Sequence, residues 1–322
     1  MVLLDEGDLM TRAELLDATE NILNKAGFQV SQRCTARASC FDFATRRNDQ
    51  LVFIKALVNI GNVSCQDASE LRRISKCFSA TALFIGDKTR GNLLEDDTVY
   101  VRYSIYAITP KTLGNSVFLQ MYPLIEAGPG GYYVNLDGDV IRKRRQELGL
   151  SVGKLAELMT VSRRTVYGYE KGMSKASVSA AYNLEWVLGA PVAQPINPFQ
   201  SVSQDKGFLA AAKRVIVRNN ILQMVLGKLT RFNFKVALTK RAPFDFIAQC
   251  PKGQLCIVGG VICEKEQNIN RRTEEILSVS EVANAQPIFV TDGKKIPNNK
   301  IPLIHCEELS QINCPEDLTA RL

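Results

Sequence analysis

The sequence has a single histidine, and none of its nine cysteines belongs to a Cys-x-x-Cys pair. Zinc ribbons and zinc fingers need cysteine or histidine ligands in closely spaced pairs, so we expect no structural zinc site, and we predict no other metal or cofactor. The odd number of cysteines favours free thiols in a reducing compartment, with a Cys34–Cys40 disulfide as the alternative.

Long apolar runs are also absent. No stretch reaches about 18 apolar residues, and the N-terminus does not combine a basic start with an apolar core. The sequence therefore predicts no membrane span and no signal peptide, and we expect a cytoplasmic protein. A length of 322 residues is enough for more than one domain.

The net charge of +7 is modest for this length, and its distribution says more than its total. Lysine and arginine gather in one short central stretch. These residues are Arg142, Lys143, Arg144, Arg145, Lys154, Arg163, Arg164, Lys171 and Lys175. A cluster of this kind is typical of nucleic-acid-binding segments.

Residues 14–114 and 217–310 repeat one order of predicted elements. Each begins with an amphipathic helix and a short strand, followed by a Phe-Asp-Phe strand that contains Asp42 in the first copy and Asp245 in the second. An apolar strand, a polar amphipathic helix, another apolar strand and a strand-to-helix junction follow in both. Buried strands that alternate with helices indicate α/β layers, so we predict a duplicated domain, with two unrelated α/β domains as the alternative.

Runs rich in glycine or proline separate these copies from the segment between them. That segment has the periodicity of α-helices almost throughout. We therefore predict five regions, which are an α/β domain at 1–125, a linker at 126–135, a helical domain at 136–192, a linker at 193–206 and a second α/β domain at 207–322.

The central segment predicts several short helices. Residues 139–150 form a basic helix in which Ile141 and Leu148 face inward, Ser151 caps a second helix and Ser162 caps a third. The second helix is expected to bury Leu155, Ala156 and Met159. A later helical segment is expected to use Val178, Ala181, Leu184, Val187 and Leu188 as its apolar face.

The third helix has a single apolar stripe, made by Val166 and Tyr169. Arg163, Arg164 and Tyr167 fall outside this stripe and face outward, and so does Gly168. The helix therefore offers arginine side chains on an exposed face, and arginine is suited to contacts with base edges and phosphates.

The central segment resembles the lambda-repressor-like (XRE/Cro) helix-turn-helix family. The resemblance rests on Leu148-Gly149-Leu150-Ser151, Leu155-Ala156, Val161-Ser162-Arg163-Arg164-Thr165-Val166, Tyr169-Glu170-Lys171-Gly172 and Leu188-Gly189. It implies that the helix beginning after Ser162 is a recognition helix, whose first residues enter the major groove of DNA. A protein-binding helical domain with a solvated basic face is the alternative.

The resemblance also implies roles for individual residues. Base contacts are expected from Arg163, Arg164, Thr165, Tyr167 and Gly168. Phosphate contacts are expected from Ser151, Lys154, Ser162, Lys171 and Lys175. Arg145 and Glu170 occupy positions that pair across helices in this family, so we expect a structural ion pair.

Three residues depart from the family's pattern. Val152 stands where the family often has a phosphate-contacting glutamine. Thr160 occupies a turn position where glycine is common, because glycine adopts positive φ at low cost. Gly168 lies at a position that often reads bases, so we expect readout to depend more on the other outward-facing residues of its helix.

The flanking copies resemble the restriction-endonuclease fold, as in archaeal Holliday-junction resolvases. That resemblance implies a magnesium site made by the aspartate of the second strand and a Glu-x-Lys pattern on the third. In the first copy Phe53 takes the glutamate position and Lys55 the lysine position, and in the second copy we assign these positions to Ile257 and Gly259. One carboxylate per copy cannot form the usual metal site, so we predict that Asp42 and Asp245 are structural.

The whole arrangement is similar to a family of archaeal helix-turn-helix transcriptional regulators, through Gly130-Gly131-Tyr132, the run from Ser162 to Val166 and the flanking α/β regions. It implies an all-α helix-turn-helix domain between two similar α/β restriction-endonuclease-like domains. It further implies sequence-specific binding of double-stranded DNA and regulation of transcription, without enzymatic activity. A divergent nuclease or resolvase-like enzyme targeted by the helix-turn-helix, or a sensor of a ligand or of redox state, are the alternatives.

The expected partners are double-stranded DNA, a second copy of the chain and the transcription machinery. One helix-turn-helix reads only a few base pairs, so we predict a two-fold homodimer on a palindromic site. We assign dimerisation to the α/β regions, with packing of the two copies within a single chain as the alternative.

Overall fold

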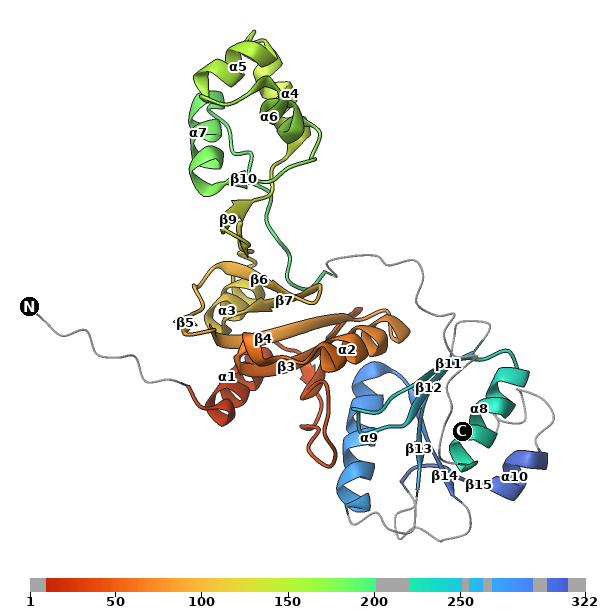
Figure 1. Cartoon of the computed structure of the whole chain (residues 1–322). Helices are drawn as coiled ribbons and strands as arrows, with labels where there is room; N and C mark the ends of the chain where they lie inside the picture. The colour runs from red at the N-terminus through yellow and green to blue at the C-terminus, as the bar shows by residue number, and fades with distance from the viewer. Residues whose placement is uncertain (1–9, 201–219, 251–254, 263–267, 292–299, 312–322) are drawn as a thin grey trace, which may run out of the picture.

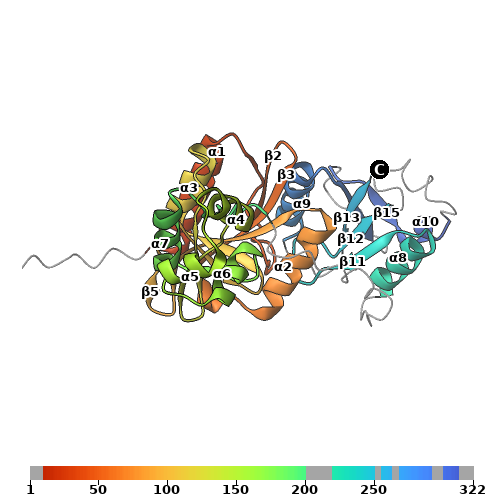
Figure 2. The same ribbon diagram turned by 90° about the horizontal axis from the view of Figure 1, so that it is seen from above.

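The computed structural model describes residues 10–200, 220–250, 255–262, 268–291 and 300–311 (Figure 1). They form a body and a helical head that stands away from it. We call residues 10–125 the N-terminal half of the body, residues 220–311 its C-terminal half and residues 134–193 the head. Figure 2 shows the head above the N-terminal half, with the C-terminal half to one side. Within the described ranges, every helix is too short or too polar to cross a membrane.

The N-terminal half is a mixed sheet with helices on both faces (Figure 1). Its helices are α1 (Arg12–Lys25), α2 (Cys65–Cys77) and α3 (Pro110–Phe118), with a 3-10 turn at Ile60–Asn62. Its strands are β1 (Gln29–Val30), β2 (Phe43–Arg47), β3 (Gln50–Asn59), β4 (Thr81–Thr89), β5 (Asn92–Leu93), β6 (Thr98–Arg102) and β7 (Ile105–Ile108).

The apolar residues of β3 show how this sheet is buried. Val52 and Ile54 belong to the core cluster that contains residues of α1 and α3, whereas Leu51 and Phe53 belong to the cluster that contains residues of α2. Successive side chains of a strand point to opposite faces, so an uninterrupted apolar run is what a strand covered on both faces requires. The sequence pattern of this strand therefore follows from its position between two helical layers.

The C-terminal half has the same strand order as the first strands of the N-terminal half. Its elements are α8 (Asn220–Arg231), β11 (Lys235–Leu238), β12 (Phe246–Gln249), β13 (Cys256–Val261), α9 (Ile269–Ala283), β14 (Gln286–Thr291), β15 (Leu303–His305) and α10 (Cys306–Gln311). The order β11-β12-β13-β14-β15 corresponds to β1-β2-β3-β4-β7, with antiparallel pairs followed by parallel pairs in both. Within the apolar run of α8, Val225 and Leu229 are buried, whereas Met224 is exposed.

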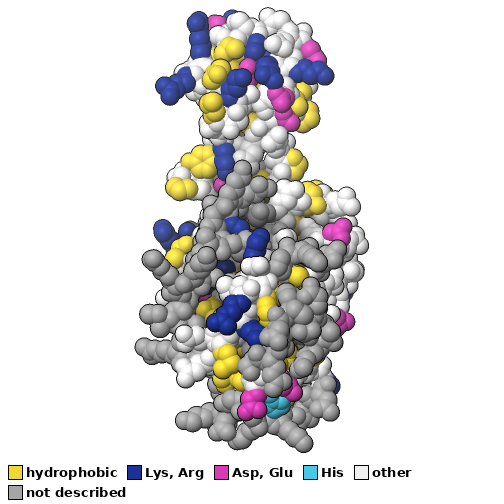
Figure 3. All heavy atoms as spheres, turned by 90° about the vertical axis from the view of Figure 1, so that its right-hand side faces the viewer, with side chains coloured by type: hydrophobic (Ala, Val, Ile, Leu, Met, Phe, Trp, Pro, Cys, Tyr) yellow, Lys and Arg dark blue, Asp and Glu magenta, His cyan; other side chains and the backbone are white. Residues whose placement is uncertain are grey.

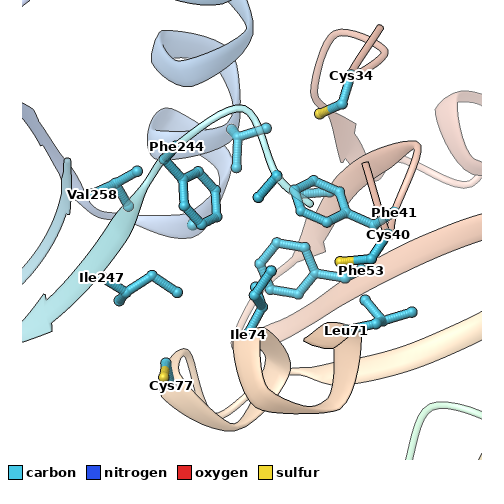
Figure 4. Close-up of a cluster of buried hydrophobic side chains, with 14 of the residues drawn as sticks. Cys34, Cys40, Phe41, Phe53, Leu71, Ile74, Cys77, Phe244, Ile247 and Val258 are labelled. Carbon is cyan, nitrogen blue, oxygen red and sulfur yellow. The ribbon is translucent and has the colours of Figure 1, made fainter. Parts of the chain in front are cut away.

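The two halves pack against each other through a shared apolar core. The cluster contains Phe41 and Phe53 from the N-terminal half and Phe244 and Ile247 from the C-terminal half (Figure 4). The ring centroids of Phe41 and Phe244 are 6.3 Å apart. Large aromatic side chains dominate the free energy of such contacts, so the body behaves as one packed unit.

Reciprocal hydrogen bonds surround this shared core. The carboxylate of Glu70 on α2 accepts from the backbone N–H groups of residues 240 and 241, at 2.5 and 2.6 Å. The carboxylate of Glu275 on α9 accepts from the backbone N–H groups of residues 35 and 36, at 2.7 and 2.8 Å. Each half thus inserts a helix glutamate into a loop of the other, as an approximate two-fold relation requires. The packing that we considered as the single-chain alternative is present, and the oligomeric state stays a prediction.

The head is built from α4 (Gly138–Glu147), α5 (Val152–Leu158), α6 (Arg163–Glu170) and α7 (Val178–Leu188). Its core includes the predicted inward residues Ile141, Leu155, Ala156, Met159, Val166, Tyr169, Ala181, Leu184 and Leu188. Two inward predictions are wrong, because Leu148 is 43% exposed and Val178 is 40% exposed. Leu148 is the C-cap of α4 and Val178 begins α7, and helical periodicity constrains a side chain least at the ends of a helix.

The segments predicted as linkers are structured where they are described. Residues 126–135 form most of a hairpin of β8 (Ile125–Gly128) and β9 (Gly131–Val134), which extends the sheet of the body through β6. The short β10 (Ala176–Ser177) pairs with β9. The glycines that suggested a linker make the hairpin turn, where Gly130 has a φ of 83°.

The second predicted linker, residues 193–206, is described only up to residue 200. Ala193 pairs with Leu136 in an isolated bridge, which joins the two connections at the base of the head. Ile196 and Phe199 are buried in the core of the N-terminal half. These apolar contacts pack residues 196–199 against the N-terminal half, whereas the sequence predicted a linker in this region.

Candidate nucleic-acid interface

The helix-turn-helix geometry is set by two serine caps. The Ser151 hydroxyl accepts from the backbone N–H of Lys154 at 3.0 Å, and the Ser162 hydroxyl accepts from that of Thr165 at 3.1 Å. These bonds satisfy N–H groups that the first turns of α5 and α6 leave without a helical partner. Both hydroxyl groups lie on exposed helix starts, which is where the sequence placed phosphate contacts.

The turn between these helices contains Thr160 in the left-handed region, with a φ of 53°. The chain is held in this turn by the bond from Val161 N–H to the Ala156 carbonyl, at 2.9 Å. A β-branched residue is strained at positive φ, so this position has the backbone conformation for which glycine is common in the family.

A buried ion pair fixes α6 to α4. Arg145 Nε lies 2.5 Å from Glu170 Oε1, and Arg145 Nη2 lies 3.3 Å from Glu170 Oε2. Arg145 Nη1 also donates to the Leu150 carbonyl at 2.8 Å. The Arg145–Glu170 pair, which the resemblance implied, therefore connects the end of α6 with α4. The bond to Leu150 ties the same arginine to the residue before the cap of α5.

The predicted base-reading residues are not equally accessible. Arg163, Arg164 and Tyr167 are exposed, whereas Thr165 is partly buried beside its capping serine. No carboxylate of the described residues lies within ion-pair distance of Arg163 or Arg164. Two exposed arginines at the start of a helix with no internal partner are free to bind an external group.

Two glycines explain how this surface is packed. A Cβ added to Gly153 of α5 would lie 3.0 Å from Arg163 Nε, so the guanidinium of Arg163 lies against α5. A Cβ added to Gly168 would lie 2.7 Å from Ser174 Oγ, in the loop after α6. The absence of a side chain at Gly168 follows from this close approach, and its predicted base contact would have to come from the backbone.

The lysines predicted to contact phosphate have different neighbours. Lys154 Nζ lies 3.1 Å from Glu157 Oε2 on the same helix, with both side chains exposed. Lys171 Nζ lies 5.8 Å from the ring centroid of Tyr167. Lys175 Nζ is 2.6 Å from Glu126 Oε2 of β8, whose side chain is mostly buried, so a phosphate would compete with that carboxylate. Figure 3 shows that the side of the head formed by α4 and α6 carries several lysine and arginine side chains.

The aspartate of the N-terminal half is held by two cations. Arg12 Nη2 lies 2.6 Å and Lys55 Nζ 3.1 Å from Asp42 Oδ1. Asp42 Oδ2 accepts from the backbone N–H of Ala56 at 2.8 Å. This carboxylate forms part of the wall of a cavity of about 470 Å³ between α1, the loop of residues 33–39 and the C-terminal half.

The aspartate of the C-terminal half is held in a similar way. Arg37 Nη1 lies 2.7 Å from Asp245 Oδ1, and Arg272 Nη2 lies 2.6 Å from Asp245 Oδ2. Asp245 Oδ2 also accepts from the backbone N–H of Val261 at 2.6 Å. Arg37 comes from the N-terminal half, so this site is closed by a side chain from across the interface.

The register of the strands corrects one sequence assignment. Phe43 pairs with Ile54 in the N-terminal half, and the corresponding pair in the C-terminal half is Phe246 with Gly259. The predicted alignment of the third strands is therefore wrong by one residue. A shift of one residue in a strand moves each side chain to the other face.

In this register the glutamate and lysine positions of the C-terminal half are Val258 and Gly260, and not Ile257 and Gly259. Arg272 of α9 takes the place of the missing lysine, because its Nη2 would be 3.1 Å from a Cβ on Gly260. The corrected positions contain no carboxylate either, so the chemical conclusion is unchanged.

The magnesium ion that a restriction-endonuclease-like fold implies does not fit these residues. Magnesium in proteins is held by carboxylate oxygens, usually together with water and substrate phosphate. Asp42 and Asp245 each provide one carboxylate, and two cationic side chains already bind each of them. The described residues contain no cluster of histidine, cysteine, aspartate or glutamate suited to a metal ion.

Arg12 and Arg272 were not predicted at these aspartates. Each lies on an amphipathic helix, where an isolated arginine gives no signal that its side chain turns inward to a strand. The available signal was the incomplete metal-site pattern. A buried carboxylate without a metal ion needs another cationic partner, so an arginine or lysine at Asp42 and Asp245 could have been expected.

The described cysteines are free thiols, and the Cys34–Cys40 bridge is not formed. Burial raises the pKa of Cys34 and of Cys40 well above the usual thiol range, and it raises the pKa of Cys77 to about 11. A thiol with a raised pKa is protonated at neutral pH and reacts slowly. Cys65 is exposed, while Cys263 and Cys314 lie outside the described residues.

Comparison with known proteins agrees with both parts of this description. Residues 12–123 match the PD-(D/E)XK superfamily domain, and residues 141–193 match the helix-turn-helix family. No solved structure matched the chain.

Curated relatives match nearly the whole chain. A protein of Pyrococcus furiosus, provisionally named as an HTH-type transcriptional regulatory protein, is 33% identical over 310 residues, which cover 96% of each chain. A protein of Methanocella arvoryzae with the same provisional name is 34% identical over 316 residues, covering 96% of this chain and 95% of that one. A Methanosarcina barkeri protein, also so named, is 31% identical over 96% of each. The chain described here belongs to this archaeal family of HTH-type transcriptional regulatory proteins.

Proposed function

We propose that the protein binds double-stranded DNA sequence-specifically through α6 and regulates transcription. The observation that carries the proposal is the pair of exposed arginines, Arg163 and Arg164, at the start of a helix anchored by the buried Arg145–Glu170 pair. A recognition helix needs this combination of a fixed position and unpaired donors.

The chemistry of these residues suits the major groove. The planar guanidinium of arginine donates two parallel hydrogen bonds to the O6 and N7 atoms of guanine, which is worth about 1–3 kcal/mol of discrimination. The serine caps and the nearby lysines, Lys154 and Lys171, are placed to hold phosphates on either side and so fix the register of the helix. Tyr167 adds an exposed aromatic ring to the same face.

The body acts as a scaffold without nuclease activity in this proposal. We propose that both halves are restriction-endonuclease-like domains, with the head inserted between them. In each half, lysine or arginine side chains bind the aspartate that would otherwise hold a metal ion. The support is the pairing of Asp42 and Asp245 with two cationic side chains each. We further propose that the regulator acts as a homodimer and that the transcription machinery is its downstream partner.

Selection of bound duplexes from a random DNA pool, at stated salt concentrations, tests the proposal. We expect one enriched motif, an affinity that falls with salt, and loss of the motif when Arg163 and Arg164 are both replaced by alanine. A pool that stays random while the protein is folded would overturn the assignment of DNA binding to the head.

Incubation with duplex, flapped and branched DNA in the presence of Mg²⁺ or Mn²⁺ tests the scaffold role separately. We expect no strand scission. Cleavage that disappears in Asp42→Ala or Asp245→Ala would show that the body is an enzyme, and would leave the role of the head unchanged.

A further inference from the structure

An exposed apolar stripe lies along α7 of the head. Val178, Tyr182 and Trp186 are spaced four residues apart and therefore share one face of the helix, with exposed fractions of 40%, 66% and 79%. The opposite face of α7 is buried through Leu184 and Leu188. We call the three exposed residues the α7 stripe. Soluble proteins rarely leave adjacent aromatic side chains in water unless another molecule covers them.

The rest of the described chain leaves the stripe uncovered. In both views α7 lies at one side of the head, away from the C-terminal half (Figures 1 and 2). None of the three residues belongs to the core cluster of the head.

DNA phosphate is also a poor match for the stripe. Glu185 is the single charged residue between Ala176 and Gln204, and there is no lysine or arginine in that stretch. The Glu185 carboxylate already accepts from the backbone N–H groups of Val192 and Ala193, at 2.8 and 3.1 Å. An apolar, uncharged surface therefore suits the stripe better than a charged one.

We propose that the α7 stripe is the contact surface for a second copy of this chain, formed when two heads occupy adjacent half-sites on DNA. In a two-fold contact the side chains near the axis meet their own copies, so like charges would repel and an uncharged apolar stripe is self-complementary. The inference rests on the proposed function, because DNA brings the two copies together. It also moves the dimer contact from the body, where the sequence placed it, to the head.

The size of the stripe determines when the contact forms. Burying an aromatic side chain removes about 150–250 Å² from water, so Tyr182 and Trp186 of two copies supply at most roughly 600–1,000 Å². Stable specific interfaces bury about 1,200 Å² or more. The copies therefore separate in dilute solution and associate on DNA, where tethering to adjacent half-sites raises their effective concentration.

The single tryptophan gives a direct readout of this contact. The probes are one duplex with two inverted copies of the selected site, placed about 10 base pairs apart from centre to centre, and one duplex with a single copy. We expect cooperative binding and a blue shift of the Trp186 emission on the first duplex, and neither on the second.

Trp186→Ser separates this contact from DNA binding. It should reduce affinity for the two-copy duplex by about tenfold or more while leaving affinity for the single-copy duplex unchanged. Tyr182→Ser, which keeps the tryptophan, should reduce the blue shift. Met121→Ser is the matched control, because Met121 is 61% exposed on the body and should change neither measurement.

The outcomes distinguish the two ideas. Binding to both duplexes without cooperativity, or full cooperativity in Trp186→Ser, overturns the α7 contact and leaves DNA binding intact. A dimer at low micromolar concentration that persists in Trp186→Ser also overturns it, in favour of a surface elsewhere. Absence of binding to either duplex overturns the proposed function and this inference with it.

Discussion

The head and the body use their charged residues in opposite ways. In the body, Asp42 and Asp245 are each bound by two cationic side chains. In the head, Arg145 pairs with Glu170 and Arg144 donates to the Leu188 carbonyl, while Arg163 and Arg164 remain exposed without a described carboxylate partner.

This difference separates a structural role from a binding role. A buried ion pair is costly to break, because removal of one partner leaves an uncompensated charge, whereas an exposed arginine contributes little to stability. Substitutions in the body should therefore change the free energy of unfolding, and substitutions on the outer face of α6 should change DNA affinity.

The largest effect is expected for Glu275→Ala. This carboxylate is almost fully buried and accepts from the backbone N–H groups of Thr35 and Ala36. Its loss removes the partner of two partly buried N–H groups that link the halves, so we expect the body to lose roughly 2 kcal/mol. Denaturant unfolding measures this loss. Glu70→Ala should act similarly, because Glu70 makes the reciprocal contact.

Glu281→Ala on the same helix is the control for Glu275→Ala. Glu281 makes one exposed contact, to Gln29 at 3.3 Å, so its removal should change the free energy of unfolding by less than about 0.5 kcal/mol. Equal losses in the two variants would contradict the assigned role of Glu275 as a clamp between the halves.

Arg163→Ala and Arg164→Ala should show the converse behaviour. Each is expected to weaken specific binding by about 1–3 kcal/mol and to relax preference at one or two base pairs. Because both side chains are exposed, the free energy of unfolding of each variant should stay within about 0.5 kcal/mol of that of the parent protein. Unchanged sequence preference in both variants would mean that α6 is not the recognition helix.

Lys171→Ala should have a smaller and less selective effect. A lysine that contacts phosphate contributes to binding of every sequence, so affinity should fall by a similar few-fold factor on matched and unmatched DNA. The slope of log K against log salt should flatten by about one. Lys175→Ala provides the comparison, and its effect should be smaller, because Lys175 is paired with Glu126. A loss confined to the matched sequence would assign Lys171 to base readout.

Most of the head could be predicted because its pattern is local. The spacing of Leu155, Val166 and Tyr169 placed them inward, and the serine caps marked the helix starts. The Arg145–Glu170 pair came from the family resemblance, since no local rule joins residues 25 positions apart. The prediction that Leu148 faces inward was wrong because Leu148 is the C-cap of α4, where periodicity no longer decides which way a side chain points.

The body was predictable in strand order but not in its contacts. The Gly259–Gly260 run provides no apolar alternation to fix the register, so the alignment of β13 was wrong by one residue. The glycine-rich segment at 126–135 suits a hairpin turn as well as a linker, and only pairing with β6 decides between them. Contacts between the halves, such as Arg37 with Asp245, join residues far apart in sequence and leave no local signal.

The smallest effect is expected for Thr160→Gly, which tests the head without changing its surface charge. Thr160 has a φ of 53°, and the left-handed region costs a residue with a Cβ about 1–2 kcal/mol. Glycine removes that cost but gains freedom in the unfolded chain, worth about 0.4–1 kcal/mol, so the net gain should be roughly 0.5–1 kcal/mol. Thermal unfolding of the full chain measures the change. Glu157→Gly, in the last turn of α5, is the control and should destabilise, because glycine disfavours the helix and the substitution removes the contact with Lys154. If Thr160→Gly also destabilised, the positive φ of Thr160 would not be a source of strain in the turn between α5 and α6.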